Sequence, residues 1–143
     1  MARDMSLEEC HAFLMYGTRT GKLATVRRDG RPHVAPVWFV MDGDTLVLNT
    51  AEGSVKAQNI AHEPRVALTV DDQQPPFSFV IVEGRAEIVD ASMEELLHWA
   101  TAIGGRYMGA GRAEAFGRRN AVPGELLVRI HPTKVIAKMN LSD

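Results

Sequence analysis

The segment NTAEGSVKAQNI, residues 49–60, carries the residues best suited to bind a ligand. Ser54 follows a glycine and precedes apolar residues at helical spacing, a pattern that predicts a helix with Ser54 as its N-cap. Lys56 then lies in the first turn, where the helix dipole disfavours a cation by about 0.3 to 1 kcal/mol. The free backbone amides, the Ser54 hydroxyl and the Lys56 ammonium could together hold an oxyanion. The simpler alternative is a capped helix with a solvated lysine, and the local sequence leaves both open.

Pro36, within VAPVWFVM, is a second candidate feature. Proline lacks an amide donor, so it belongs on an edge strand or at a bulge. Part of that strand's backbone then faces something other than a neighbouring strand. A planar ligand could lie there, or the proline could simply protect an edge strand from aggregation.

The most basic segment is GGRYMGAGRAEAFGRRN, residues 104–120. Its arginines suit phosphate or carboxylate groups, although a solvated loop is the alternative. They are Arg106, Arg112, Arg118 and Arg119.

Conventional catalytic groups are sparse in this chain. The five histidines are scattered and form no HExxH or HxxxH pair, so no metal site is expected. Cys10 lies on the apolar side of a predicted helix, where a cysteine usually packs as a small hydrophobe. No GxSxG or Walker motif occurs, and no side chain can be assigned as catalytic. If the protein is an enzyme, a cofactor is expected to carry the reactivity.

Length and composition predict one domain over residues 1–143. The net charge is −2, and 45% of residues are hydrophobic, as in ordinary globular proteins. The longest apolar run is far shorter than a membrane span, and the first residues lack the apolar core of a signal peptide. With a single cysteine, a reducing cytoplasmic location is expected. Overall charge gives no indication of nucleic acid binding.

Local signals predict alternating strands and short helices in the first half of the chain. A capping box at Ser6 and Glu9 begins a helix that runs to Gly17 and is expected to cover an open barrel end. KLATV, RPHVAPVWFVM and TLVLNT are predicted to form an antiparallel meander, with turns at Asp29-Gly30 and Asp42-Gly43. The Ser54 helix must end near Glu63, because Pro64 cannot continue it.

The second half continues the same pattern. RVALTV and FSFVIVEGRAEIV read as strands, the latter bending at Gly84, and a helix with a capping box at Ser92 and Glu95 extends to Ile103. ELLVRIHPTKVIAKM forms the last strand, with a possible break at Pro132. The expected fold is mainly β, a small closed or split antiparallel β-barrel of six to seven strands with three to four short helices.

Nearly the whole chain resembles the flavin- and deazaflavin-dependent oxidoreductases of the pyridoxamine phosphate oxidase-like split-barrel superfamily. The most specific part is SVKAQNIAHEPRVAL. In that family a Ser-x-Lys at a helix start contacts cofactor phosphate, the helix carries an asparagine, and an Asn/Glu-Pro-Arg-Val turn leads into the next strand. The matching residues here are Ser54, Lys56, Asn59 and Glu63-Pro64-Arg65-Val66.

The resemblance implies a homodimer with cofactors at the subunit interface. Ser54, Lys56 and Asn59 would hold the phosphate, and Trp38, Phe77 and Tyr107 are candidate walls, although core or dimer packing is the alternative role for Trp38 and Phe77. The residues expected to bind cofactor are Pro36, Val37, Trp38, Thr50, Ser54, Val55, Lys56, Ala57, Asn59, Phe77, Arg106 and Tyr107.

The resemblance favours the deazaflavin F420 as the cofactor. FMN-dependent pyridoxamine phosphate oxidases carry an Arg and a Lys roughly where this chain has Val34 and Phe39. The strand HVAPVWF and the ending LVRIHPTKV are closer to the F420-dependent branch, whose substrates would be flat, electron-poor small molecules accepting hydride. The alternatives are an FMN-dependent oxidoreductase and a protein that carries flavin, F420 or haem without turnover.

Overall fold

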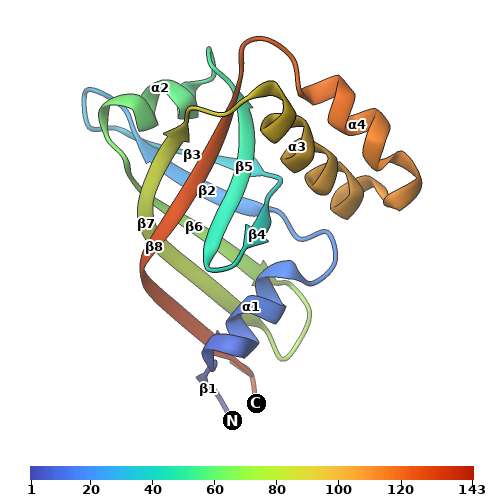
Figure 1. The fold of residues 1–143 in the computed structure, drawn as a ribbon. Coiled ribbons are helices and arrows are strands. Elements are labelled where there is room, and N and C mark those ends of the chain that lie inside the picture. Colours follow the sequence, from blue (N-terminus) through green and yellow to red (C-terminus); the bar gives the residue numbers. More distant parts are fainter.

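The computed structural model describes residues 1–143 (Figure 1). Its strands are β1 (Arg3–Asp4), β2 (Gly21–Val26), β3 (Pro32–Val37), β4 (Val40–Asp42), β5 (Thr45–Ala51), β6 (Arg65–Asp72), β7 (Ser78–Val89) and β8 (Glu125–Met139). Its helices are α1 (Leu7–Met15), α2 (Val55–His62), α3 (Met93–Met108), the short 3₁₀ helix η1 (Ala110–Arg112) and α4 (Ala113–Asn120).

The strands form one antiparallel, eight-stranded sheet in the order β3-β2-β6-β7-β8-β5-β4, with β1 attached to β8. The sheet curls around the main hydrophobic core, but its two end strands, β3 and β4, do not pair. This is the predicted mainly β split barrel with an open seam. The structure has eight strands rather than six or seven, because it includes the two-residue β1 and divides one predicted strand.

The predicted strand RPHVAPVWFVM, residues 31–41, is wrong as a single element. β3 ends at Val37, which pairs with Gly21 of β2, whereas β4 begins at Val40, which pairs with Val47 of β5. Trp38 and Phe39 carry the chain from one end of the sheet to the other. Phe39 lies in the connection but is fully buried, so the apolar run continues through it. The sequence therefore gives no sign that one strand ends and another begins there.

The glycine- and arginine-rich segment is helical, not a loop. Helix α3 continues past the predicted end at Ile103 to Met108, and α4 packs beside it (Figure 1). The glycines allow this close approach. A Cβ on Gly117 would lie 2.0 Å from Thr101 Oγ1, and one on Gly104 would lie 2.7 Å from Phe116 Cβ. Composition left a solvated loop as an alternative because it cannot distinguish glycines in turns from glycines in helix contacts.

The predicted helix starts are confirmed at Ser6, Ser54 and Ser92. Ser6 and Glu9 form both bonds of a capping box, whereas at Ser92 only the hydroxyl accepts, from the Glu95 amide. No helix in the structure combines the length and apolar character needed to cross a bilayer.

Helix α1 lies across the barrel end opposite α2 (Figure 1) and contributes Cys10 and Leu14 to the main core.

Strand β8 runs unbroken through Pro132, and its pairing with β7 shifts register between Glu83 and Gly84. A Cβ at Gly84 would lie 2.5 Å from His131 O, so glycine permits this close strand contact. The predicted irregularity at Gly84 is confirmed, and the possible break at Pro132 does not occur.

Replacing Gly117 by alanine should destabilise the protein. Alanine favours a helix by about 1 kcal/mol, but the added methyl group meets Thr101, including its Cα at 3.0 Å, and overpacking costs about 1–3 kcal/mol. Because the clash includes a backbone atom, we place the cost of overpacking at about 2–3 kcal/mol and expect a net loss of about 1–2 kcal/mol in the free energy of unfolding, measured with urea. Gly111→Ala is the matched control, because nothing lies within 4 Å of its added Cβ. Equal stability of the two variants would contradict the proposed helix contact.

Candidate functional site

The start of α2 presents free hydrogen-bond donors. The Ser54 hydroxyl accepts from the Ala57 amide at 3.1 Å and lies 2.9 Å from Thr50 Oγ1. The first helical bond runs from Gln58 N to Ser54 O. The amides of Val55 and Lys56 precede that bond, so neither has a carbonyl partner within the helix. Two donors and the positive end of the helix dipole therefore face outward from one helical turn.

Lys56 forms no hydrogen bond and no ion pair, although it is partly buried. No acidic residue occupies the first turn of α2. By contrast, Lys22 and Lys138 pair with Asp71 and Asp4. The α2 start thus combines an unpaired ammonium with unpaired amides, the chemistry expected of an anion site.

A groove of about 270 Å³ opens beside Lys56. One wall is formed by the end of β3 and the residue after it, and other parts come from β5, α3, α4 and β8. The lining residues are Pro36, Val37, Trp38, Asn49, Thr50, Lys56, Ile103, Asn120 and Glu125. The structure therefore brings five of the twelve predicted residues into one groove, at the end of the molecule where α2 lies.

Pro36 occupies the predicted position on an edge strand. β3 pairs only with β2, so one of its edges has no strand partner. Alternate residues Pro32, Val34 and Pro36 are exposed, and the exposed fraction of Val34 is 66%. The edge is therefore apolar and lies next to the groove.

Trp38 forms the aromatic side of the groove, and Tyr107 supports it from behind. Their rings stack with centroids 4.9 Å apart and an interplanar angle of 9°. The Tyr107 hydroxyl donates to Arg19 O at 3.0 Å and accepts from the Phe39 amide at 3.3 Å. Burial raises the pKa of Tyr107, so the phenol stays protonated at neutral pH. Tyr107 thus fixes the wall rather than lining the groove.

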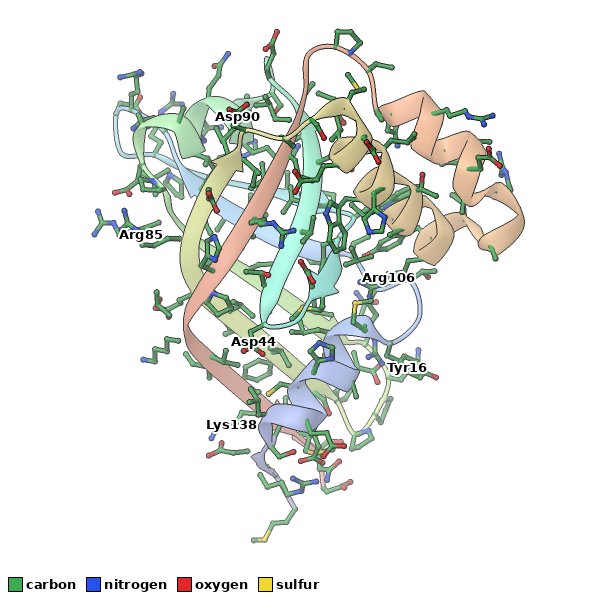
Figure 2. The ribbon with its side chains drawn as sticks, in the orientation of Figure 1. Tyr16, Asp44, Arg85, Asp90, Arg106 and Lys138 are labelled. Carbon is green, nitrogen blue, oxygen red and sulfur yellow. The ribbon has the colours of Figure 1, made fainter.

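Arg106 lies between α3 and α1, away from the groove lining (Figure 2). Its guanidinium donates to the carbonyl oxygens of Phe39, Leu14 and Gly17 at 2.6, 2.7 and 3.0 Å. It also stacks over the Phe39 and Tyr107 rings. Desolvation by burial lowers its pKa. Its donors are occupied by backbone, so it acts as a brace within the fold.

The remaining α2 residues differ in their placement. Val55 is exposed at the helix start, whereas Ala57 is buried beneath it. Asn59 is also buried, and its Nδ2 donates to Thr25 Oγ1 of β2 at 3.0 Å. Asn59 therefore joins α2 to the barrel, while Ser54 and Lys56 stand at the exposed end of the helix.

Phe77 does not reach the groove of its own chain. It lies in the β6–β7 connection, with φ of 58° and 40% exposure, at the barrel end near α1 (Figure 1). Its backbone carbonyl accepts from the Leu141 amide near the C-terminus. Helix α2 stands at the opposite end of the barrel.

Sequence reasoning missed four groove residues: Asn49, Ile103, Asn120 and Glu125. Asn49 Nδ2 donates to Glu125 Oε2, and these residues come from neighbouring strands separated by 76 positions. No local motif marks such a pair. Asn120 ends α4, so placing it required the helical assignment of the basic segment.

An antiparallel barrel whose end strands β3 and β4 do not pair places the fold in the split-barrel class. Residues 6–139 match the family described as Pyridoxamine 5'-phosphate oxidase. The chain therefore belongs to the pyridoxamine 5'-phosphate oxidase family.

Solved structures show the same architecture. The conserved hypothetical protein Rv2991 from Mycobacterium tuberculosis is 29% identical, with a TM-score of 0.81 over 93% of this chain and 84% of that chain. An F420 reductase is 27% identical, with a TM-score of 0.68 over 87% and 94% of the two chains. The haem storage protein HutZ from Vibrio cholerae is 20% identical, with a TM-score of 0.72 over 94% of this chain and 96% of that chain, and shares the fold.

Arg106→Lys should destabilise the protein despite keeping the charge. An ammonium cannot reproduce a planar fork that reaches carbonyls of three separate segments, and bonds to charged groups contribute about 1.5–3 kcal/mol each. We expect a loss of about 2–3 kcal/mol in the free energy of unfolding, together with a changed near-ultraviolet circular dichroism of the Trp38–Tyr107 stack. Arg118→Lys, on exposed α4, is the control and should stay near wild type. If Arg106→Lys had the same free energy of unfolding as wild type, the proposal that Arg106 braces the fold would be wrong.

Proposed function

We propose that this protein is an F420-dependent oxidoreductase that transfers hydride between the reduced deazaflavin and a flat, electron-poor small molecule. The observation that carries the proposal is the unpaired Lys56 ammonium at the amide-rich start of α2, opening onto a groove with an aromatic wall. The 27% identity to an F420 reductase over most of both chains supports it.

The residues present fit a phosphorylated planar cofactor. Ser54 shapes the helix start, and Lys56 and the first-turn amides supply positive charge and donors for a phosphate. Trp38 and Ile103 offer apolar surface for a ring system, and the Pro36–Trp38 backbone lies at the unpaired end of β3. When bound, the cofactor supplies the hydride chemistry.

Two positions favour F420 over FMN. Where the resemblance places an Arg and a Lys in FMN-dependent relatives, this chain has Val34 and Phe39. Val34 is exposed and apolar, and Phe39 is fully buried in the core. Neither residue can provide a charged contact. Lys56 is the only cation among the residues that line the groove.

The protein's task in such a reaction is positioning. Lys56 and Glu125 are the only charged side chains lining the groove. Lys56 is assigned to the phosphate, and Glu125 accepts a hydrogen bond from Asn49. Hydride transfer needs alignment and exclusion of water more than a dedicated acid or base. Trp38, fixed by Tyr107, gives one rigid surface for that alignment.

We further propose that a second copy of the chain completes the site. The groove of about 270 Å³ is smaller than the roughly 300–1,000 Å³ typical of ligand pockets. It adjoins the apolar edge of β3, where Pro32, Val34 and Pro36 are exposed. A homodimer formed along this edge would bury those residues and deepen the groove.

Lys56→Ala should weaken F420 binding by about tenfold or more, because a charge-assisted phosphate contact contributes about 1.5–3 kcal/mol. Affinity is measured by titrating the purified protein with F420 and with FMN, following cofactor absorbance and fluorescence. Lys134→Ala, on exposed β8, is the matched control and should bind like wild type. Full affinity in Lys56→Ala would refute the anion site, whereas tighter binding of FMN than of F420 would reassign the cofactor.

The enzymatic role is tested separately from binding. Wild-type protein loaded with reduced F420 is offered quinones, enones and tetrapyrroles, and cofactor reoxidation is recorded against a protein-free background. We expect reoxidation with at least one class. Tight binding with no reoxidation across the panel would instead indicate a carrier.

Val34→Asp should convert a dimer to monomer, because it places unpaired charges on the proposed apolar interface. Molecular mass is measured by sedimentation equilibrium. Leu141→Asp alters another exposed apolar residue, 43% exposed against 66% for Val34, near the C-terminus and should leave the dimer intact. A monomeric wild type at micromolar concentration would contradict the proposal.

A further inference from the structure

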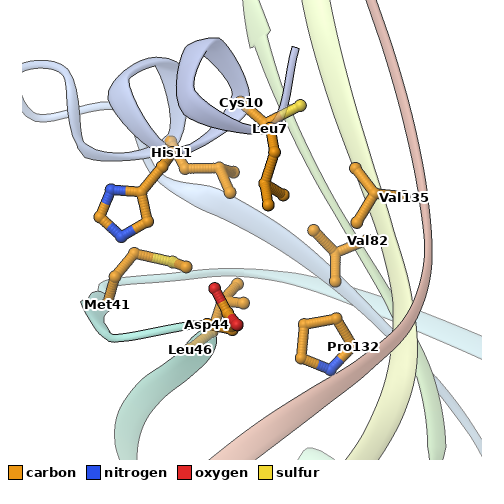
Figure 3. A pocket seen from close by; sticks show the side chains of 10 residues that line it. Leu7, Cys10, His11, Met41, Asp44, Leu46, Val82, Pro132 and Val135 are labelled. Carbon is orange, nitrogen blue, oxygen red and sulfur yellow. The ribbon is translucent and has the colours of Figure 1, made fainter. Parts of the chain in front are cut away.

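A second cavity, of about 260 Å³, lies between α1 and the barrel, remote from α2 (Figures 1 and 3). Seven of its ten lining residues are hydrophobic. Its floor includes Leu46 and Val82, which have almost no solvent exposure. The cavity shares no lining residue with the groove beside Lys56. It is therefore a separate, mainly apolar space.

The mouth of this cavity exposes large apolar side chains. Leu7 is 75% exposed and Val135 is 41% exposed. Between its pairing with β5 at Ile130 and with β1 at Lys138, this edge of β8 has no strand partner. Solvent therefore reaches the cavity past Val135 and Pro132. A molecule entering here would remove Leu7 and Val135 from water, and burial of apolar area favours binding.

The polar groups of the cavity are acceptors. Asp44 contributes a carboxylate that has no hydrogen bond or ion pair, unlike nearby Asp42, which pairs with Arg129. His11 Nε2 donates to Gly43 O at 3.2 Å, so in the neutral ring Nδ1 is an acceptor. No lysine or arginine lines the cavity. The two lysines of β8, Lys134 and Lys138, do not line it, and Lys138 is paired with Asp4.

Size limits the ligand. A dry, apolar cavity of about 150 Å³ accommodates benzene, so about 260 Å³ has room for a bicyclic ring or a branched chain of similar bulk. The enclosed walls provide no donor for a carboxylate or phosphate. The acceptors Asp44 and His11, on the side of the cavity opposite Val135 (Figure 3), suit a head group that brings donors and positive charge.

We infer that the cavity beneath α1 is a binding site for a small organic amine, with its apolar body against Leu46, Val82 and Val135 and its ammonium beside Asp44. Figure 3 shows Asp44 at one side of the cavity and the apolar side chains of Val82, Val135 and Pro132 at the other. This site is independent of the proposed cofactor groove, because the two share no lining residue and lie at different ends of β5 and β8.

Cys10 offers a reporter specific to this cavity. It is the only cysteine of the chain, lines the cavity and is 5% exposed. Burial, and secondarily the charge of Glu9, raises the pKa of its thiol, so modification is slow and a bound molecule should slow it further.

The experiment measures the rate at which a thiol reagent modifies Cys10 in the presence of three matched probes. These are 2-naphthylmethylamine, the neutral 2-naphthylmethanol and the anionic 2-naphthylacetate, each titrated to millimolar concentration. We expect saturable protection by the amine at the lowest concentration, weaker protection by the alcohol and none by the acid. Absence of protection by the amine, or equal protection by all three, would overturn the proposal.

Two variants locate the site. Asp44→Asn should weaken the amine about two- to fivefold, the contribution of an exposed ion pair, and leave the alcohol unchanged. Val135→Trp should fill the mouth and abolish protection by both, while Lys56→Ala should change neither. Amine affinity unaffected by Asp44→Asn, or retained in Val135→Trp, would contradict the assigned position even if the cofactor proposal holds.

Discussion

The fold depends on how it satisfies the backbone where the barrel is open. Trp38 and Phe39 cross from β3 to β4, so their peptide groups cannot join the sheet ladder. Phe39 is buried, and a buried carbonyl or amide without a partner is costly. The Arg106 guanidinium donates to the Phe39 carbonyl, and the Tyr107 hydroxyl, which donates to Arg19 O, accepts from the Phe39 amide. One turn of α3 thus replaces the missing strand partner at the seam.

Elements with local signals were predictable from sequence. Serine caps, Pro64 and the turns at Asp29-Gly30 and Asp42-Gly43 each act within a few residues, and Gly30 and Gly43 adopt the positive φ that such turns require. The division of residues 31–41 was not predictable, because β3 and β4 find partners at opposite ends of the sheet. The role of Arg106 was hidden for the same reason. Its carbonyl partners lie 67 to 92 positions away.

The candidate site shows the same division. The roles of Ser54 and Lys56 were predictable from the rules for helix starts, and the edge position of Pro36 was predictable from its missing amide. The sequence therefore predicted a helix start that could bind phosphate and a strand with one unpaired edge. Asn49 and Glu125 meet only through the pairing of β5 with β8. Glu125, the one carboxylate in the groove, is bonded to Asn49 and forms no ion pair with Lys56, whose ammonium has no partner.

Rigidity links the seam to the groove. Trp38 is stacked on Tyr107, whose hydroxyl is fixed by backbone groups, and Arg106 ties the same turn of α3 to the end of α1 through the Leu14 and Gly17 carbonyls. An aromatic wall held this way loses little conformational freedom when a planar ring lies against it, so less binding free energy is lost in ordering it. The contacts that close the backbone at Phe39 therefore also preorganise Trp38, and the open seam, which would otherwise weaken a small barrel, becomes the place where a rigid ligand wall can form.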